Sequence, residues 1–152
     1  MTKETYNMAI NYHPKPGQIL MCDFSQGFSE PEMVKRRPVI VLTPSMAGRS
    51  GLVTVVACST AAPELRMPFH LELPKRHLPQ TGFFQNDPTW LKGDMIYSVG
   101  FHRLDLVQYG KRNVDGKRAY FINTLPPDLM REVRACVLHG LAMSQLVPNL
   151  AA

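Results

Sequence analysis

Two apolar segments, residues 37–43 and 52–60, constrain what this chain can fold into more than any other feature. The first reads Arg-Pro-Val-Ile-Val-Leu-Thr, and the second ends Val-Val-Ala-Cys-Ser-Thr. Both are rich in β-branched residues, and the glycine-containing segment between them predicts a turn, so together they predict an antiparallel hairpin. Arg37 opens the first strand and two hydroxyls, Ser59 and Thr60, close the second. The hairpin therefore predicts a cation and a hydroxyl on one side of a small sheet.

The remaining pattern predicts many short strands followed by a single helix. Two segments are expected to be mostly loop, residues 25–35 and 74–92, and residues 100–118 are expected to connect elements with at most one helical turn. Further strands are predicted at residues 18–24, 67–73, 94–99 and 119–123.

The helix follows Pro126-Pro127, because proline suits a first helical turn and Asp128 favours the positive end of the helix dipole. Apolar residues then recur at three- and four-residue steps to about Leu146, and Pro148 ends the pattern. The expected fold is mainly β (α+β), a small barrel or strongly curved sheet with a C-terminal helix. Residues 1–16 are expected to form an N-terminal tail, and residues 17–147 a single domain.

Charge and cysteine content limit the possible environments and partners. The chain has 152 residues and a net charge of +5, from 17 basic and 12 acidic residues. Such a surplus attracts nucleic acid or an acidic protein segment, although basic pairs are also common in solvated turns. No run approaches the roughly 18 apolar residues of a membrane span, and the N-terminus has no apolar core of a signal peptide. Three cysteines without CxxC spacing predict buried, reduced thiols and a cytoplasmic location.

The residues of the hairpin suit metal-free cleavage of a phosphodiester. Arginine neutralises a phosphorane because its planar fork meets two phosphate oxygens and stays charged. A hydroxyl can donate to a phosphate oxygen, and Glu32, in the preceding loop, can accept a proton if its pKa is raised. Each of these residues also has a purely structural interpretation. Arg37 can be a surface arginine before a proline, the hydroxyls can cap a turn, and Glu32 can simply be solvated. The five histidines show no HExxH spacing, so no metal site or cofactor is expected.

Aromatic rings near this hairpin would matter for single-stranded RNA, whose bases stack on them. Phe24 and Phe28 follow the first strand, and Trp90 precedes the strand at 94–99. Phe24 is equally suited to the core, and Trp90 to covering the barrel, whereas Phe28 lies in a polar loop.

These motifs resemble the MazF/PemK family of toxins from toxin–antitoxin pairs. The resemblance rests on Gly17-Gln-Ile-Leu-Met-Cys-Asp-Phe24, on Glu32 five residues before Arg37-Pro38, and on the strand that ends at Thr60. It is clear over residues 17–60 and weaker at residues 90–99 and 126–146. Met33 stands where the family usually has glutamine, and residues 74–92 are longer than the family needs.

The resemblance implies a CcdB/MazF-type SH3-like barrel that forms a homodimer in the cytoplasm. It also implies a metal-independent, sequence-specific endoribonuclease that cuts single-stranded RNA and is neutralised by an acidic antitoxin. Arg37 takes the place of the family's catalytic arginine and Glu32 that of its acidic loop residue. Thr60 is favoured for the hydroxyl, with Ser59 as the alternative. We expect Phe24, Phe28, Lys35 and Arg36 to contact RNA.

Two other functional classes fit the same fold. One is a DNA gyrase poison of the CcdB kind. Such poisons have a tryptophan near the C-terminus, and this chain does not resemble them there, because it has none after Trp90. The third possibility is a barrel that binds nucleic acid or protein without catalysis.

Overall fold

The computed structural model describes residues 10–112, 116 and 118–150. Seven strands carry the fold: β1 (Ile19–Phe24), β2 (Lys35–Val41), β3 (Leu52–Ser59), β4 (His70–Glu72), β5 (Trp90–Gly100), β6 (Leu104–Arg112) and β7 (Arg118–Phe121). The helices are α1 (Gly82–Asn86) and α2 (Pro127–Gly140), with short 3₁₀ turns η2 (Lys75–His77), η3 (Phe101–Arg103) and η4 (Ser144–Asn149).

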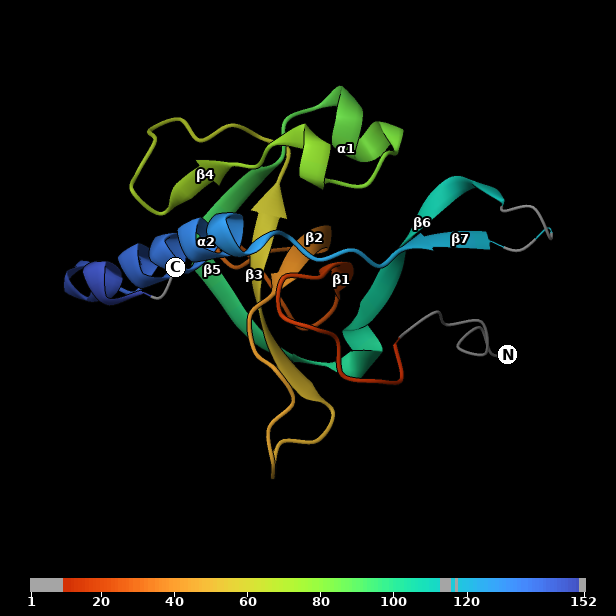
Figure 1. Ribbon diagram of the computed structural model, residues 1–152, viewed down its shortest axis with the longest axis horizontal. Helices are drawn as coiled ribbons and strands as arrows, with labels where there is room; N and C mark the ends of the chain where they lie inside the picture. Colours follow the sequence, from red (N-terminus) through yellow and green to blue (C-terminus); the bar gives the residue numbers. More distant parts are fainter. Residues whose placement is uncertain (1–9, 113–115, 117, 151–152) are drawn as a thin grey trace.

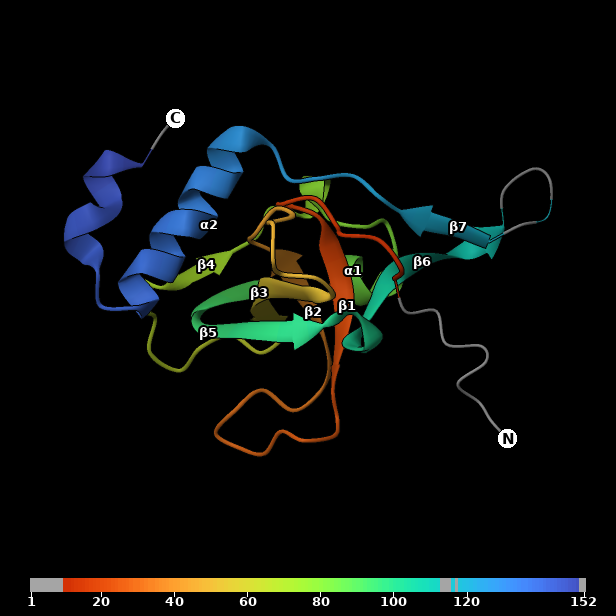
Figure 2. The same cartoon turned by 90° about the horizontal axis from the view of Figure 1, so that it is seen from below.

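The strands form one antiparallel sheet in the order β4-β5-β3-β2-β1-β6-β7, which curls into an SH3-like barrel. Figures 1 and 2 show α2 along one side of the barrel, while the β6–β7 hairpin extends away on the other side. The predicted fold class, mainly β with a C-terminal helix, is confirmed. So is the central hairpin, in which Val39 pairs with Ala57 and Val41 with Val55.

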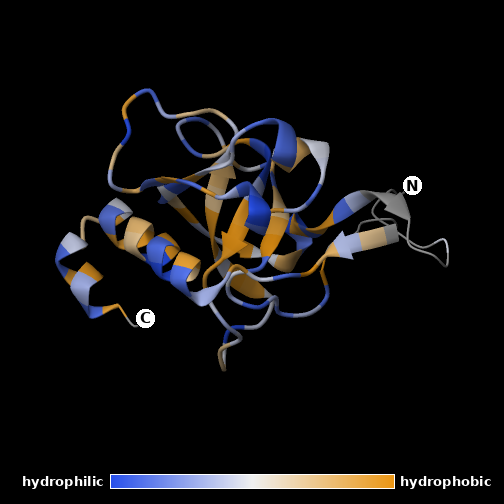
Figure 3. Cartoon of the chain, turned by 45° about the horizontal axis from the view of Figure 1, so that its top comes forward, coloured by the Kyte–Doolittle hydropathy of each residue, from blue (hydrophilic) through white to orange (hydrophobic). Residues whose placement is uncertain are grey.

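Both faces of the central strands are buried, because successive strand residues point to opposite sides. On one side Leu20, Val39 and Val55 pack around Phe24, and we call this the Phe24 face. On the other side, the α2 face, Ile40 and Val56 pack with residues of the helix. Figure 3 shows the resulting concentration of apolar residues in the middle strands. Each fully buried aliphatic side chain stabilises the fold by about 1.5–3 kcal/mol.

The helix α2 crosses β5 at unusually short range. A Cβ on Gly93 would lie 2.5 Å from the carbonyl oxygen of Cys136, and a Cβ on Gly140 would meet the backbone of Gly93. Glycine at both positions therefore lets the helix and the strand approach backbone to backbone. This contact fixes the helix against the sheet.

The helix is shorter than its apolar pattern predicted. It ends at Gly140, not near Leu146, and Ala142 takes a left-handed φ of 60° that breaks the helical path. Residues 144–149 then form η4 beside α2, as Figure 2 shows. The apolar residues past the helix end, Leu141, Met143 and Leu146, are exposed.

The sequence analysis missed one strand and misplaced the bounds of others; β2, for example, spans Lys35–Val41 and not residues 37–43. The segment expected to connect elements contains β6, a nine-residue strand whose Leu104 pairs with Cys22 of β1. Strand β5 begins at Trp90, four residues earlier than expected, because its first residues pair with both β3 and β4. The edge strand at 67–73 has only three residues, His70–Glu72.

Residues 10–16 pack against the barrel: Ile10 is buried, and its N–H donates to the carbonyl oxygen of Leu104 at 3.0 Å. Residues 1–9, also expected to be tail, lie outside the described residues. Cys22, Cys58 and Cys136 are buried free thiols, as predicted. Among the described helices, none has the length and apolar character needed to cross a membrane.

Candidate functional site

Arg37 lies near the start of β2, where it pairs with Cys22 of β1. It shares the Phe24 face with Val39 and Val41, because these residues are two and four positions further along the strand. Its side chain is half-buried, and Nε donates to the carbonyl oxygen of Val34 at 3.2 Å. Among the described residues, neither Nη nitrogen has a hydrogen-bond or ion-pair partner. The guanidinium is thus held at one edge and keeps the pair of donors that binds two phosphate oxygens.

The two candidate hydroxyls differ in their relation to Arg37. The hydrogen-bonded ladder between β2 and β3 ends at Val39 and Ala57. If the same register is extended by two residues beyond this pair, Ser59 lies opposite Arg37 and on the same face of the sheet. Thr60 follows the end of β3 and belongs to the alternate position of the register, which is opposite Arg36.

Ser59 also has the local role that its sequence position suggests. It is 9% exposed, and its Oγ accepts a hydrogen bond from the N–H of Ala61 at 3.1 Å. This bond caps the turn that leaves β3 and fixes the hydroxyl oxygen. The hydroxyl proton remains available to an acceptor such as a phosphate oxygen.

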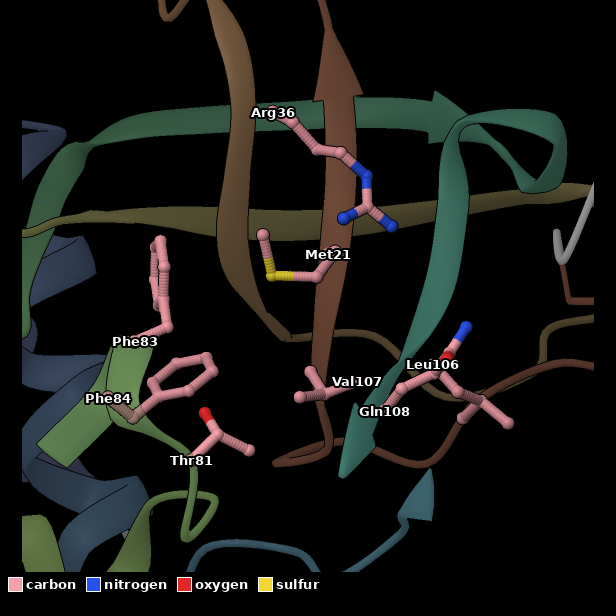
Figure 4. Close-up of a pocket in the computed structure, with 8 residues that line it drawn as sticks. All are labelled: Met21, Arg36, Thr81, Phe83, Phe84, Leu106, Val107 and Gln108. Carbon is pink, nitrogen blue, oxygen red and sulfur yellow. The ribbon is translucent and has the colours of Figure 1, made fainter. Parts of the chain in front are cut away.

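Arg36 and Lys35 do not share the surroundings of Arg37. Arg36 lies on the α2 face, and its Nη2 donates to Oδ2 of Asp105 at 2.7 Å in an ion pair. It lines a cavity of about 240 Å³ together with side chains of β1, β6 and α1, including Met21 and Phe84 (Figure 4). Lys35 is exposed and has a left-handed φ of 69°.

The loop between β1 and β2, which extends below the barrel in Figure 2, carries Glu32. The carboxylate oxygen Oε1 of Glu32 accepts from the N–H of Ser29 at 2.9 Å, so it stabilises a turn of the loop. No hydrogen bond or ion pair joins Glu32 to Arg37 in the described part of the chain. The structure therefore gives Glu32 a local structural contact, and no contact with the candidate arginine.

Three aromatic rings anchor this loop. Phe24 contacts Phe28 with ring centroids 5.0 Å apart and Tyr97 at the same distance, and Phe28 also meets Tyr97. The Tyr97 hydroxyl accepts from the N–H of Met33 at 2.8 Å. Burial, with a contribution from the Glu32 carboxylate, raises the pKa of Tyr97. Phe24 is completely buried, so its ring is part of the core and is closed to an RNA base, whereas Phe28 is half-buried.

Arg103 holds the same loop, and nothing in the local sequence pointed to this role. Its Nη1 donates to the carbonyl oxygens of Asp23 and Gln26, at 3.1 and 2.9 Å, across 80 and 77 residues of sequence. The guanidinium carbon also lies 4.8 Å from the centroid of the Phe28 ring. A contact over such a separation has no local signal, because it depends on β6 pairing with β1.

The described residues contain no group of three or more histidine, cysteine, aspartate or glutamate side chains placed to hold a metal ion. The chemistry that the described geometry offers at Arg37 is anion binding: two guanidinium donors, with a fixed hydroxyl on the neighbouring strand.

Comparison with known proteins agrees with this architecture. Residues 15–141 match the family described as the PemK-like, MazF-like toxin of the type II toxin–antitoxin system. MazF from Deinococcus radiodurans superposes with a TM-score of 0.58 at 22% identity, over 88% of this chain and 100% of that one. A mycobacterial endoribonuclease in complex with its cognate antitoxin gives 0.54 at 16% identity, over 86% and 96% of the two chains.

A sequence relative is known from Escherichia coli. The putative uncharacterized protein YifN is 26% identical over 92% of this chain and 99% of its own length. The barrel, its C-terminal helix and the arginine-bearing hairpin thus define a fold of the MazF kind. Because the family match covers most of its length, the chain belongs to the PemK/MazF family of type II toxins.

Proposed function

We propose that this chain is the toxin of a toxin–antitoxin pair and acts as a metal-independent, sequence-specific endoribonuclease on single-stranded RNA. One observation supports this proposal above the others. Arg37 presents two Nη donors that no described residue occupies, on the face of the sheet that also carries Ser59, in a chain of the PemK/MazF family. An anion with several oxygens, such as a phosphodiester, matches that donor set.

In the proposed reaction the ribose 2′-oxygen attacks the adjacent phosphorus, and the bond to the 5′-oxygen of the next nucleotide breaks. The products are a 2′,3′-cyclic phosphate and a 5′-hydroxyl. As it attacks, the 2′-hydroxyl gives its proton to a solvent water. Arg37 balances the charge on the phosphorane and donates a proton to the departing 5′-oxygen, and the guanidinium takes a proton back from the solvent. A hydroxyl of β3 binds a phosphate oxygen. Charge stabilisation of this kind typically contributes a factor of about 10²–10³ in rate per donor group.

The register leads us to prefer Ser59 over Thr60 for the hydroxyl, because Ser59 shares the face of Arg37. Phe28 and Lys35 are the RNA contacts we retain, since both are at least partly exposed. Arg36 is proposed only as a peripheral phosphate contact, because Asp105 already holds one of its nitrogens. Glu32 assists by keeping the β1–β2 loop in place.

We further propose an acidic antitoxin, a homodimer and a cytoplasmic location. The net charge of +5 suits an acidic partner, and the mycobacterial neighbour was solved with its cognate antitoxin. Light scattering of the purified protein would report the dimer, and mixing with a cognate acidic protein should abolish RNA cleavage.

The defining experiment incubates the purified protein with a long RNA in EDTA and maps the 5′ ends of the fragments. We expect cuts at one short recurring sequence, with 5′-hydroxyl ends. An intact RNA, together with inhibition of DNA supercoiling by gyrase, would replace this proposal with that of a gyrase poison. An intact RNA without that inhibition would leave a barrel that only binds.

A further inference from the structure

Trp90, the single tryptophan of the chain, is the partner of Ser59 in the sheet. It is the first residue of β5, and it pairs with Ser59 on one side and with Glu72 of β4 on the other. Directly paired residues of an antiparallel sheet point to the same face. Trp90 therefore continues, by one strand, the face that carries Arg37 and Ser59.

Trp90 is half-buried, and its ring is already in contact with a cation. The guanidinium carbon of Arg66, an exposed residue of the β3–β4 loop, lies 5.5 Å from the ring centroid. An arginine over an indole face has the geometry of a cation–π contact. The indole N–H is buried without a hydrogen-bond partner among the described residues, so the exposed part of the side chain is the carbon surface of the ring.

A second cation lies two residues further along β5 on the same side. Lys92 pairs with His70 of β4, and both are half-buried. Burial, and then the charges of Lys92 and Arg66, lower the pKa of His70. Asp94 acts on His70 in the opposite direction, and Glu72 adds a negative charge at the outer edge of the sheet. Arg66 and Lys92 nevertheless extend the positive charge of Arg37 along this face, to both neighbours of Trp90.

We propose that Trp90 is a stacking platform for a nucleobase next to the cleaved phosphodiester, with Arg66 and Lys92 binding the backbone phosphate of that nucleotide. This inference rests on the proposed ribonuclease function and adds a base-binding subsite to it. An aromatic face flanked by cations is the combination that single-stranded nucleic acid binds, because every base offers a π face and every linkage a negative charge. The phosphate held by Arg37 and Ser59 would place the adjoining base one strand away, over Trp90.

The single tryptophan makes a direct test possible. A short single-stranded RNA with 2′-O-methyl groups cannot supply the attacking hydroxyl, so it measures binding without cleavage. Titrating it into the full-length protein should quench the tryptophan emission in a saturable manner. Labelled RNA and fluorescence anisotropy then give the affinity of variants that lack the indole.

We expect Trp90→Ala to weaken binding by between about 5-fold and 150-fold, which is the usual range for one stacked base. Trp90→Phe should retain most of the affinity, because it keeps a flat ring. This variant also keeps the test valid if Trp90→Ala does not fold. Arg66→Ala should lower the slope of log affinity against log salt by about 0.7, the value for one phosphate contact to a single strand. Phe83→Ala, which removes an exposed ring on α1 beside the cavity of Arg36, is the matched control and should lose far less affinity than Trp90→Ala.

The results separate this inference from the proposed function. Cleavage by the wild type with unquenched emission at saturating RNA would overturn the base subsite and leave the ribonuclease intact. Wild-type affinity in a folded Trp90→Ala variant would do the same. If the wild type neither cuts nor binds RNA, the proposed function fails and the subsite fails with it.

Discussion

The backbone of Gly93 in β5 crosses that of Gly140 in α2 so closely that neither residue has room for a side chain. A Cβ at Gly93 would lie 2.5 Å from the carbonyl oxygen of Cys136 and 2.7 Å from that of Phe69. Real carbon–oxygen contacts of this kind are longer, so the helix or the strand would have to shift. The position of α2 on the barrel therefore depends on two glycines that no local turn requires.

Gly93→Ala should destabilise the protein by about 1–3 kcal/mol, because relieving the overlap separates the helix from the sheet. Gly82→Ala in α1 is the matched control. Its added Cβ meets only the end of the flexible Asn86 side chain, at 3.2 Å. Urea unfolding monitored by circular dichroism measures both variants, and equal midpoints would show that the crossing tolerates a methyl group.

Lys35 is the only residue of β2 with a positive φ, 69°, in a region that costs a residue with a Cβ about 1–2 kcal/mol. Lys35→Gly removes this cost but adds conformational entropy to the unfolded chain, which offsets part of the gain. The net free energy of unfolding should therefore rise by about 0.5–1 kcal/mol. Lys35→Ala keeps the Cβ and should gain nothing. A glycine variant no more stable than the alanine variant would contradict this account.

The three cysteines should be unreactive in the folded protein. Burial raises the pKa of Cys22 and Cys58 to about 12 and that of Cys136 to about 11, so the reactive thiolate is scarce at about pH 8. Alkylation followed by intact mass measurement should find no modified thiol in the native protein and three after denaturation. Rapid native labelling would mean that a strand or α2 opens frequently.

The same pKa values predict a loss of stability in alkaline solution. A thiol whose folded pKa lies above its ordinary value of 9.0 contributes its full stability below pH 9.0. As the pH rises from there towards the folded values, the unfolded chain ionises first. Each thiol then costs about 1.4 kcal/mol per pH unit. Cys136→Ala should show a shallower decline of the urea midpoint between those limits than the wild type, and an identical decline would contradict the assigned pKa shift.

Ser59 and Thr60 can be separated by single substitutions. We expect Ser59→Ala to reduce RNA cleavage by about 10²-fold or more, because it removes a hydroxyl from the face of Arg37. It should also cost about 0.5–1.5 kcal/mol of stability, since the N–H of Ala61 loses its acceptor. Thr60→Ala should cleave nearly as the wild type does. The reverse pattern would assign the phosphate contact to Thr60 and show that the register does not continue past Ala57.

Local sequence predicted the central hairpin and α2 well, because their apolar runs match a strand and a helix period. It failed at β6, where the alternation of Leu104, Asp105 and Leu106 is brief and the partner strand β1 is distant in sequence. It also failed at the end of α2, since the apolar pattern continues past Gly140 while the backbone turns at Ala142.

The candidate site shows the same limit. Arg37 could be singled out from sequence because it directly precedes a proline and an apolar, β-branched run. The choice between two adjacent hydroxyls depends on strand register, and a one-residue difference exchanges the faces of the sheet. The pairing of Ser59 with Trp90 and the loop contacts of Arg103 could not be predicted from local sequence either, because they join residues that meet only in the folded barrel.

The proposed function depends above all on Arg37, which stabilises the phosphorane. The adjacent arginine, Arg36, provides the matched control. Arg36→Ala removes the same charge one residue away but on the α2 face, where the guanidinium pairs with Asp105. The decisive measurement is the initial rate of RNA cleavage in EDTA by the wild type, Arg37→Ala and Arg36→Ala, each shown to be folded by its melting curve. We predict that Arg37→Ala loses at least about 10²–10³-fold in rate, while Arg36→Ala stays within about tenfold of the wild type. Comparable cleavage by a folded Arg37→Ala variant, or an equal loss in both variants, would contradict the account.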